Sequence, residues 1–203
     1  MGFIAHDCVE SWVHMGFFIQ YRFLLLFWAL FCAGFSAIAS NQPPSPQALQ
    51  TFRGQVVWVN DGDTLMVRLA NRRKWRVRLA DIDAPEKNQP YGEDAKKSLI
   101  GMVQRQDVRL ECRKKTDQYG RKICKVFVKP VSCPACGQTL DAGLAMLTMG
   151  MAWWYGSTGI EAHPQDRGAY AFAEKEARAR KIGLWREANP VEPRLWRKLN
   201  PLY

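Results

Sequence analysis

Apolar and polar residues alternate along several short runs in the first part of the chain. From Lys74 to Leu79, Trp75, Val77 and Leu79 alternate with basic residues, a period of two that is typical of a half-buried β-strand. The run 54–67 has β-rich halves on either side of an Asp-Gly turn, which predicts a hairpin. Strand-like runs at 108–112 and 121–128 flank a turn at 116–120. We therefore predict a mainly β region over residues 54–128.

Helical spacing of apolar residues dominates the rest of the chain. It predicts a helix over 92–103, between the strand runs, a second over 140–149 and a third over 168–182 that ends near Gly183. Residues 186–203 contain three prolines and are expected to form an extended tail. The order of elements indicates an α+β class, and the natural candidate is a five-stranded OB-type β-barrel with three helices.

The first 39 residues have the pattern of a secretory signal. An uncharged apolar run over 23–39 follows Arg22, and the small residues Ala37 and Ala39 end it. We expect residues 1–39 to be a signal peptide and the protein to be exported, either to the periplasm or outside the cell. A retained membrane anchor is the alternative, since about 17 apolar residues is the short limit for a span. Met15 is a second candidate start, and the polar, proline-rich residues 40–50 form a predicted linker.

Length and charge narrow the function further. The chain has 203 residues and a formal net charge of +10, which suits one domain with a polyanionic partner such as nucleic acid. A merely basic, soluble surface is the alternative. Of the three histidines only His163 lies beyond the predicted leader, which argues against a histidine-based nuclease centre.

Four cysteines lie beyond the predicted leader: Cys112, Cys124, Cys133 and Cys136. An even number in an exported chain favours disulfides, with Cys112–Cys124 and Cys133–Cys136 as the favoured pairs. A zinc site made by four thiols and free thiols remain the alternatives.

Three short motifs could together cleave a phosphodiester. They are Asp61-Gly62-Asp63-Thr64, the segment from Arg78 to Glu86, and Thr116-Asp117-Gln118-Tyr119-Gly120-Arg121. Each alone could be an ordinary turn or helix start.

The residue types in these motifs match the needs of the reaction. Asp63, Asp83 and the carbonyl of Ala84 could bind a hard cation such as calcium, which takes oxygen ligands. Arg78 and Arg121 could hold phosphate oxygens through bidentate hydrogen bonds. Glu86 could take the proton from the attacking water.

In this order and spacing, the segments VNDGDT, RVRLADIDAPE and TDQYGR resemble the staphylococcal nuclease family over residues 55–185. The resemblance implies an OB-type barrel with three helices and calcium-dependent hydrolysis of DNA and RNA that leaves 3′-phosphate ends. Asp63 and Asp83 match the family's calcium ligands, Glu86 its proposed general base, and Arg78 and Arg121 its phosphate-binding arginines. Ala84 replaces a threonine but keeps the carbonyl that binds the metal.

Three aromatic residues are candidates for substrate binding. Trp153 and Tyr155 match residues that line the family's nucleotide pocket, with Trp153 in place of a tyrosine, and Tyr119 lies in the third motif. Stacking on bases would suit such rings. A place in the core or on an ordinary aromatic surface is the alternative for 151–155.

Two segments depart from the family pattern. Residues 130–139 form a longer loop than expected, and residues 187–203 extend beyond the predicted nuclease domain at 51–186. In the extension, Arg194, Arg197 and Lys198 could contact phosphate, or the segment could wrap the barrel.

Two other functions are weighed beside an active nuclease: a nucleic-acid-binding module without catalysis, and a redox protein that uses Cys133 and Cys136. No obligate protein partner is inferred. We expect a monomer that contacts a membrane only through the leader.

Overall fold

The computed structural model describes residues 49–133, 135–155 and 164–201. The predicted leader, most of the predicted linker and His163 lie outside these residues. In the part of the chain that is described, none of the helices combines the length and the apolar character needed to cross a membrane.

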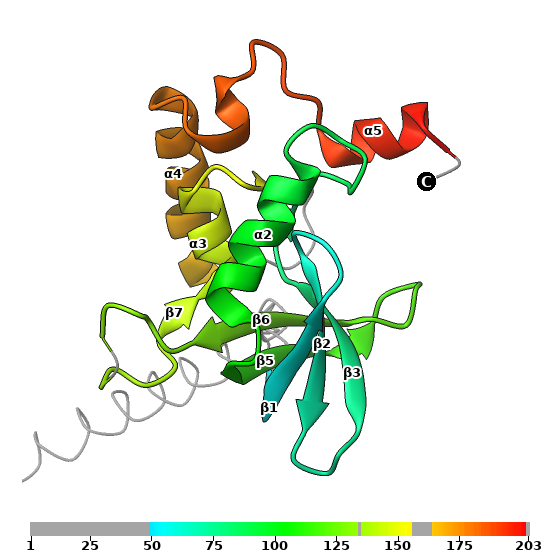
Figure 1. Cartoon of the computed structure of the whole chain (residues 1–203), viewed down its shortest axis with the longest axis vertical. Helices are drawn as coiled ribbons and strands as arrows, with labels where there is room; N and C mark the ends of the chain where they lie inside the picture. Colours follow the sequence, from blue (N-terminus) through cyan, green and yellow to red (C-terminus); the bar gives the residue numbers. More distant parts are fainter. Residues whose placement is uncertain (1–48, 134, 156–163, 202–203) are drawn as a thin grey trace, which may run out of the picture. The chain divides into compact units, whose positions relative to one another are not determined.

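Five strands form a closed, mixed β-barrel (Figure 1). Their order is β3-β2-β1-β5-β6, and a parallel pairing of β3 with β6 closes the barrel, while the other pairs are antiparallel. The strands are β1 (Gln50–Val59), β2 (Thr64–Leu69), β3 (Lys74–Leu79), β5 (Asp107–Thr116) and β6 (Lys122–Val128). Two residues of β7 (Leu140–Asp141) extend the sheet beside β6, and β4 (Ile82–Asp83) pairs with β8 (Trp153–Trp154). The predicted α+β class with an OB-type barrel is confirmed.

The first strand serves both halves of the barrel. Its N-terminal part pairs with β5 and its C-terminal part pairs with β2, with a register shift between Val56 and Trp58. Gly54 lies in both pairings, where a Cβ atom would come within 2.6 Å of Val67 Cγ1. A glycine is required there because the strands approach too closely for any side chain.

Helices cover one side of the barrel and continue into the C-terminal segment (Figure 1). They are α2 (Gly92–Val103), α3 (Ala142–Thr148), α4 (Pro164–Ala179), the short 3₁₀ helix η2 (Gly183–Arg186) and α5 (Pro193–Leu199). The first three correspond to the predicted helices. The prediction of an extended tail is wrong, because α5 is helical and begins with a proline at its first turn, where the missing N–H is not needed.

The core lies inside the barrel and beneath α2 and α3. Alternate residues of the strands point inward, as in β6, whose buried positions are Cys124, Val126 and Val128. Leu99 and Val103 of α2 and Met146 and Leu147 of α3 belong to the same apolar cluster. A second, smaller cluster contains Trp153, Ala177, Leu184 and Trp185. The strand ends and loops that carry the three motifs rest on this frame.

Candidate functional site

The Asp61–Thr64 turn joins β1 to β2 and fixes the first acidic group. One carboxylate oxygen of Asp61 accepts hydrogen bonds from the N–H groups of Asp63 (3.0 Å) and Thr64 (2.7 Å). A Cβ atom at Gly62 would lie 2.7 Å from the Cβ atoms of both Ala84 and Ala95. The turn therefore packs directly against the loop after β4 and against α2, which brings Asp63 beside Ala84.

Asp63 and Asp83 converge on one guanidinium group. Arg78 Nη1 forms an ion pair with Asp63 Oδ2, and Arg78 Nη2 lies 2.9 Å from Asp83 Oδ1. The N–H of Ala84 donates to Asp63 Oδ2 (3.1 Å). The two acidic side chains are only 10% and 3% exposed, so their charges are compensated by bonded partners rather than by water.

The environment holds Asp63 ionised. Burial alone would raise the pKa of its carboxyl, but the charge of Arg78 and the hydrogen bonds from Arg78, Ala84 and Thr64 outweigh burial and lower it. A carboxylate that stays charged inside the protein is the form that a cation requires.

Arg121 reaches the same place from the β5–β6 hairpin. Asp117 receives the N–H groups of Tyr119 (2.9 Å) and Arg121 (2.8 Å) on one oxygen and Arg121 Nε (2.7 Å) on the other. Arg121 Nη1 also donates to the hydroxyl of Thr64 (3.1 Å), and that hydroxyl donates to Asp63 Oδ1 (2.8 Å). Asp63, Asp83, Arg78 and Arg121 therefore lie in one connected cluster.

Asp117 and Thr64 belong to the quoted motifs, yet the sequence assigned them no role. In the structure Asp117 fixes both the turn and the guanidinium of Arg121, and Thr64 links Arg121 to Asp63. The signal was available, since an aspartate two and four residues before the groups it caps is typical of such turns.

Glu86 lies two residues after Ala84 and contacts the C-terminal segment. Its carboxylate accepts a hydrogen bond from Arg197 Nη1 (2.6 Å). Arg197 also donates to both oxygens of Asp83, at 3.3 Å and 2.9 Å. A third guanidinium thus enters the cluster from α5, 111 residues beyond Glu86 in the chain. From the sequence we expect Arg197 only as a possible phosphate contact. No local sequence pattern predicts its bonds to Asp83 and Glu86.

The three aromatic candidates lie in different surroundings. Trp153 is 6% exposed, pairs through its backbone with Asp83 and packs edge-on against Trp185 at 5.0 Å between ring centroids. The expectation that Trp153 offers a stacking face to bases does not fit this burial, since its ring is taken up by the second core cluster. Tyr119 is 65% exposed, with Arg121 5.3 Å from its ring, and Tyr155 is 40% exposed.

The four cysteines form two separate pairs. Cys112 and Cys124 are bonded across β5 and β6, and Cys133 is bonded to Cys136 in the loop before β7. The oxidation state of the purified protein stays a prediction, which a thiol titration would measure.

The oxygen donors around Arg78 fit a hard cation in kind. Asp63 and Asp83 supply carboxylates from two segments that meet, and calcium and magnesium both bind such oxygen ligands. Among the residues that the structure describes there is no group of three or more His, Cys, Asp or Glu suited to hold a metal. A cation shared by Asp63 and Asp83 would therefore need further ligands from carbonyl groups or water, and the carbonyl of Ala84 stays the predicted one.

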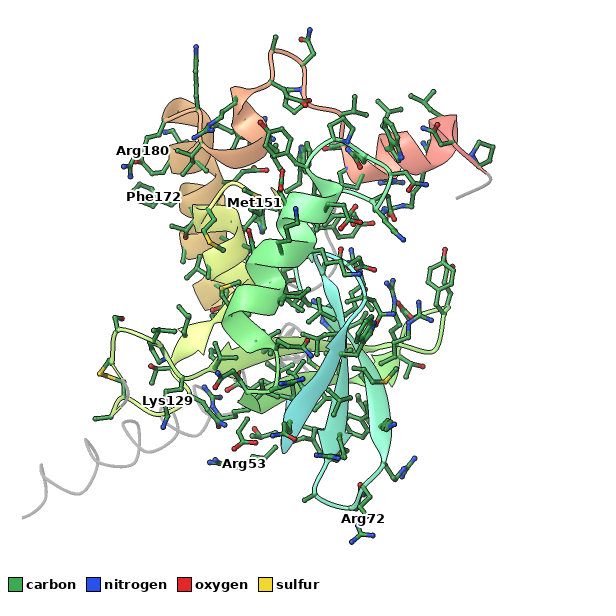
Figure 2. All side chains as sticks on the ribbon, in the orientation of Figure 1. Arg53, Arg72, Lys129, Met151, Phe172 and Arg180 are labelled. Atoms are coloured by element: carbon green, nitrogen blue, oxygen red, sulfur yellow. A yellow bond between two sulfur atoms is a disulfide. The ribbon has the colours of Figure 1, made fainter. Side chains whose placement is uncertain are left out.

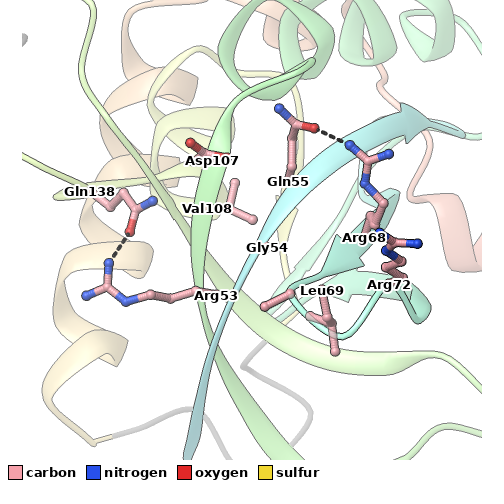
Figure 3. A pocket seen from close by; sticks show the side chains of 10 residues that line it. Arg53, Gly54, Gln55, Arg68, Leu69, Arg72, Asp107, Val108 and Gln138 are labelled. Atoms are coloured by element: carbon pink, nitrogen blue, oxygen red, sulfur yellow. Dashed lines mark hydrogen bonds between the residues drawn. The ribbon is translucent and has the colours of Figure 1, made fainter.

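A separate groove lies away from this cluster. Its volume is about 860 Å³, and Arg53, Arg68 and Arg72 lie along it with Gln55 and Gln138 (Figure 3). Arg68 donates to Gln55 (2.8 Å), and Arg72 projects from the β2–β3 turn (Figure 2). The residues of the three motifs do not line this groove.

Comparisons with known proteins agree with the motifs. The family model described as "Staphylococcal nuclease homologue" matches residues 76–187. The chain is 42% identical over 163 residues to Protein ParB of Escherichia coli, a match that covers 80% of this chain and 88% of that protein. It is 43% identical over 156 residues to a micrococcal nuclease of Shigella flexneri, covering 76% of this chain and 85% of that protein. An uncharacterized endonuclease of Haemophilus influenzae is 38% identical over 144 residues, covering 71% and 72%.

Proposed function

Because the chain belongs to the staphylococcal nuclease family, we propose that it is a calcium-dependent nuclease that hydrolyses phosphodiester bonds in DNA and RNA. The observation that carries the proposal is the convergence of Asp63 and Asp83 on Arg78, with Arg121 linked to the same cluster through Thr64. Family membership makes the chain a nuclease, a hydrolase of nucleic acids. Calcium, the 3′-phosphate product and export are the finer parts of the proposal.

In this proposal, Asp63, Asp83 and the carbonyl of Ala84 would hold the calcium ion. A bound cation would supply charge that polarises a phosphoryl oxygen and stabilises the transition state. The oxygen-only donors support calcium or magnesium over zinc, which prefers nitrogen and sulfur.

Two arginines would bind the phosphate. Arg78 and Arg121 have planar groups with several donors, so each can bond to a carboxylate and still present an N–H to a phosphate oxygen. The side chains of Arg78 and Arg121 are buried to a similar degree, at 15% and 16% exposed. This burial favours fixed positions over mobile ones. Preorganised donors of this kind stabilise developing charge at no cost of reordering.

Glu86 would act as the general base. Its side chain is 37% exposed, so water can reach it, and the loop that carries it follows directly from the two cation-binding positions Asp83 and Ala84. A base at that place could accept the proton from an attacking water. Attack that leaves the phosphate on the 3′ side would give the 3′-phosphate ends proposed.

The apolar run and small-residue ending of residues 1–39 support export to the periplasm or outside the cell. We expect the secreted form to begin near residue 40. N-terminal sequencing of the protein recovered from the cell envelope or medium would test this, and an intact residue-1 or residue-15 start in a membrane fraction would favour the retained anchor instead.

The direct test of the activity is digestion of DNA and RNA by the purified protein in calcium, in magnesium, and with a chelator. The proposal expects cleavage in calcium that stops with the chelator and returns when calcium is restored. End-group analysis of the products should find 3′-phosphates. Binding to nucleic acid in calcium without any cleavage would instead favour the non-catalytic binding module.

Variants assign the activity to this cluster. Arg121→Ala and Glu86→Gln should each lower the cleavage rate about 10²-fold or more, while far-ultraviolet circular dichroism stays unchanged. Arg72→Ala is the matched control, because it also removes one positive charge but lies in the separate groove. Full activity in both site variants would remove the proposed mechanism.

A further inference from the structure

The C-terminal helix α5 places one arginine on the two acids that the proposed mechanism needs most. Arg197 Nη2 lies 2.9 Å from Asp83 Oδ2, and Arg197 Nη1 lies 2.6 Å from Glu86 Oε1 and 3.3 Å from Asp83 Oδ1. Both oxygens of Asp83 are therefore bonded to guanidinium groups, since Arg78 also donates to Oδ1. Charge-assisted bonds of this kind are among the stronger ones in proteins.

The two arginines on Asp83 differ in how easily they could leave it. The side chain of Arg78 is 15% exposed and that of Arg197 is 41% exposed. A guanidinium that is already partly in water recovers its hydration when the bond breaks, whereas a buried one would leave an uncompensated charge behind. Arg197 is thus the exchangeable partner of Asp83.

The segment that carries Arg197 has its own attachment. The side-chain amide of Gln89 accepts the N–H of Glu86 (3.1 Å) and donates to the carbonyl of Val191 (2.6 Å). Gln89 is only 6% exposed, so this link is a buried contact between the loop that carries Glu86 and the chain just before α5. Figure 1 shows α5 next to the loop that precedes α2. The attachment keeps Arg197 near Asp83 even when its own bonds are broken.

A divalent cation and this guanidinium compete for the same carboxylate. Two positive groups held within a few ångströms of each other in a poorly hydrated site repel strongly. A cation bound by Asp83 would also need the oxygen lone pairs that Arg197 uses. Binding of the cation to Asp83 therefore weakens the bonds of Arg197 to Asp83, and those bonds weaken binding of the cation.

We propose that Arg197 is a further residue of the candidate site, and that its guanidinium competes with the divalent cation for Asp83. The proposal rests on the proposed function, because it assumes that Asp83 binds a cation. It goes beyond that function by giving the C-terminal segment a role: Arg197 bonds to Asp83 and Glu86 and so sets the calcium concentration at which the site fills.

Isothermal titration of the purified protein with calcium chloride tests the competition. Arg197→Ala should bind calcium roughly five- to twenty-fold more tightly than the unaltered protein. Lys198→Ala is the matched control, because it removes the same charge from an exposed position of the same helix without removing a bond to Asp83 or Glu86. We expect the control to stay within about twofold of the unaltered protein, by the same linkage argument.

Reciprocity supplies a second readout that needs no variant. If Arg197 excludes the cation, then calcium must loosen Arg197 and α5 by the same coupling free energy. Amide hydrogen exchange over residues 193–200 should therefore become faster when calcium is added to the unaltered protein. In Arg197→Ala the exchange should be fast with or without calcium.

The outcomes separate this inference from the proposed function. Calcium-dependent cleavage by the unaltered protein, together with equal or weaker calcium binding in Arg197→Ala, would overturn the competition alone. Calcium that slows exchange in α5 or leaves it unchanged would overturn it too. If the unaltered protein neither binds calcium nor cleaves nucleic acid, the proposed function falls and the competition falls with it.

Discussion

Asp81 and Asp83 are separated by one residue, and their carboxylates belong to two different polar clusters. Asp83 lies in the candidate site with Asp63, Arg78 and Arg197. Asp81 lies in a second group, the barrel–helix cluster, where the barrel meets α3 and α4. Its members are Asp81, Arg113, Lys125, Asp141, Asp166 and Tyr170, and the charges of Lys125 and Asp166 act on Asp81.

Burial and ion pairing do not distinguish the two clusters. Arg113 bonds to Asp81 at 3.0 Å, and their side chains are 18% and 8% exposed, close to the values in the candidate site. Lys125 bonds to both Asp141 (3.2 Å) and Asp166 (2.9 Å). A search for buried acid–base pairs alone would have returned both clusters.

Asp141 and Asp83 differ in what their carboxylates are bonded to, although Asp81, like Asp83, is bonded to a guanidinium group. Asp141 accepts from the N–H groups of Gly143 and Leu144 at the start of α3 and from the hydroxyl of Tyr170, which are fixed parts of the fold. Asp83 is bonded through its side chain to guanidinium groups of Arg78 and Arg197. Backbone donors cannot be replaced by a ligand without unfolding a helix end, whereas a guanidinium can move aside. We therefore expect changes in the candidate site to lower the cleavage activity and changes in the barrel–helix cluster to lower the stability of the fold.

The largest effect is expected for Arg78→Lys. Lysine keeps the charge but has no planar fork, so it cannot bond to Asp63 and Asp83 through two separate nitrogens or present the same donors to phosphate. The cleavage rate should fall about 10²- to 10³-fold, as measured by initial rates on DNA in calcium. A rate within about threefold of the unaltered protein would remove Arg78 from the chemistry.

Lys125→Met should have the reverse profile. Burial disfavours the charged amine, but the hydrogen bond to Asp166 and the charge of Asp141 outweigh it and raise the pKa of Lys125. Removing the amine leaves two acids without that partner and should lower the free energy of unfolding by about 2–4 kcal/mol, as measured by urea denaturation. The cleavage rate per folded molecule should stay unchanged, and a loss of rate without a loss of stability would break the comparison.

Tyr170→Phe is the smallest change in the barrel–helix cluster. Burial and the charge of Asp141 raise the pKa of Tyr170 far above its ordinary value, so the hydroxyl stays a donor to Asp141 (2.8 Å). Its loss should cost about 1–2 kcal/mol of stability, visible as a small shift of the urea midpoint. Equal midpoints for the two proteins would show that this hydrogen bond adds nothing to the fold.

Local patterns in the sequence were enough to predict most of the strands and helices. The alternation in Lys74–Leu79 predicts β3 to the residue, and helical spacing predicts α2 with its observed ends. The second predicted helix, 140–149, is instead a two-residue strand followed by α3, because Asp141 caps the helix through Gly143 and Leu144. The helix predicted over 168–182 both begins and ends earlier, since α4 spans Pro164–Ala179.

Contacts between distant segments were beyond the reach of such patterns. The sequence favours Trp153 as a base-stacking residue, with a place in the core or on an aromatic surface as the alternative, and its packing on Trp185 and its pairing with Asp83 bury it. Pro193 at the start of α5 was a readable helix signal that the three prolines of the tail obscured. Arg197 and Asp83 are 114 residues apart in the chain, so no local sequence pattern could predict the bond between them.

The most direct test compares the two neighbouring aspartates in one assay. Cleavage of DNA is measured against calcium concentration for Asp83→Asn and Asp81→Asn, with rates expressed per folded molecule. Asparagine keeps the size of both side chains and tolerates the positive φ of 63° at position 81. We predict a loss of at least about 10²-fold for Asp83→Asn and a nearly unchanged rate for Asp81→Asn. Equal effects of the two changes, or a larger loss at position 81, would contradict this prediction.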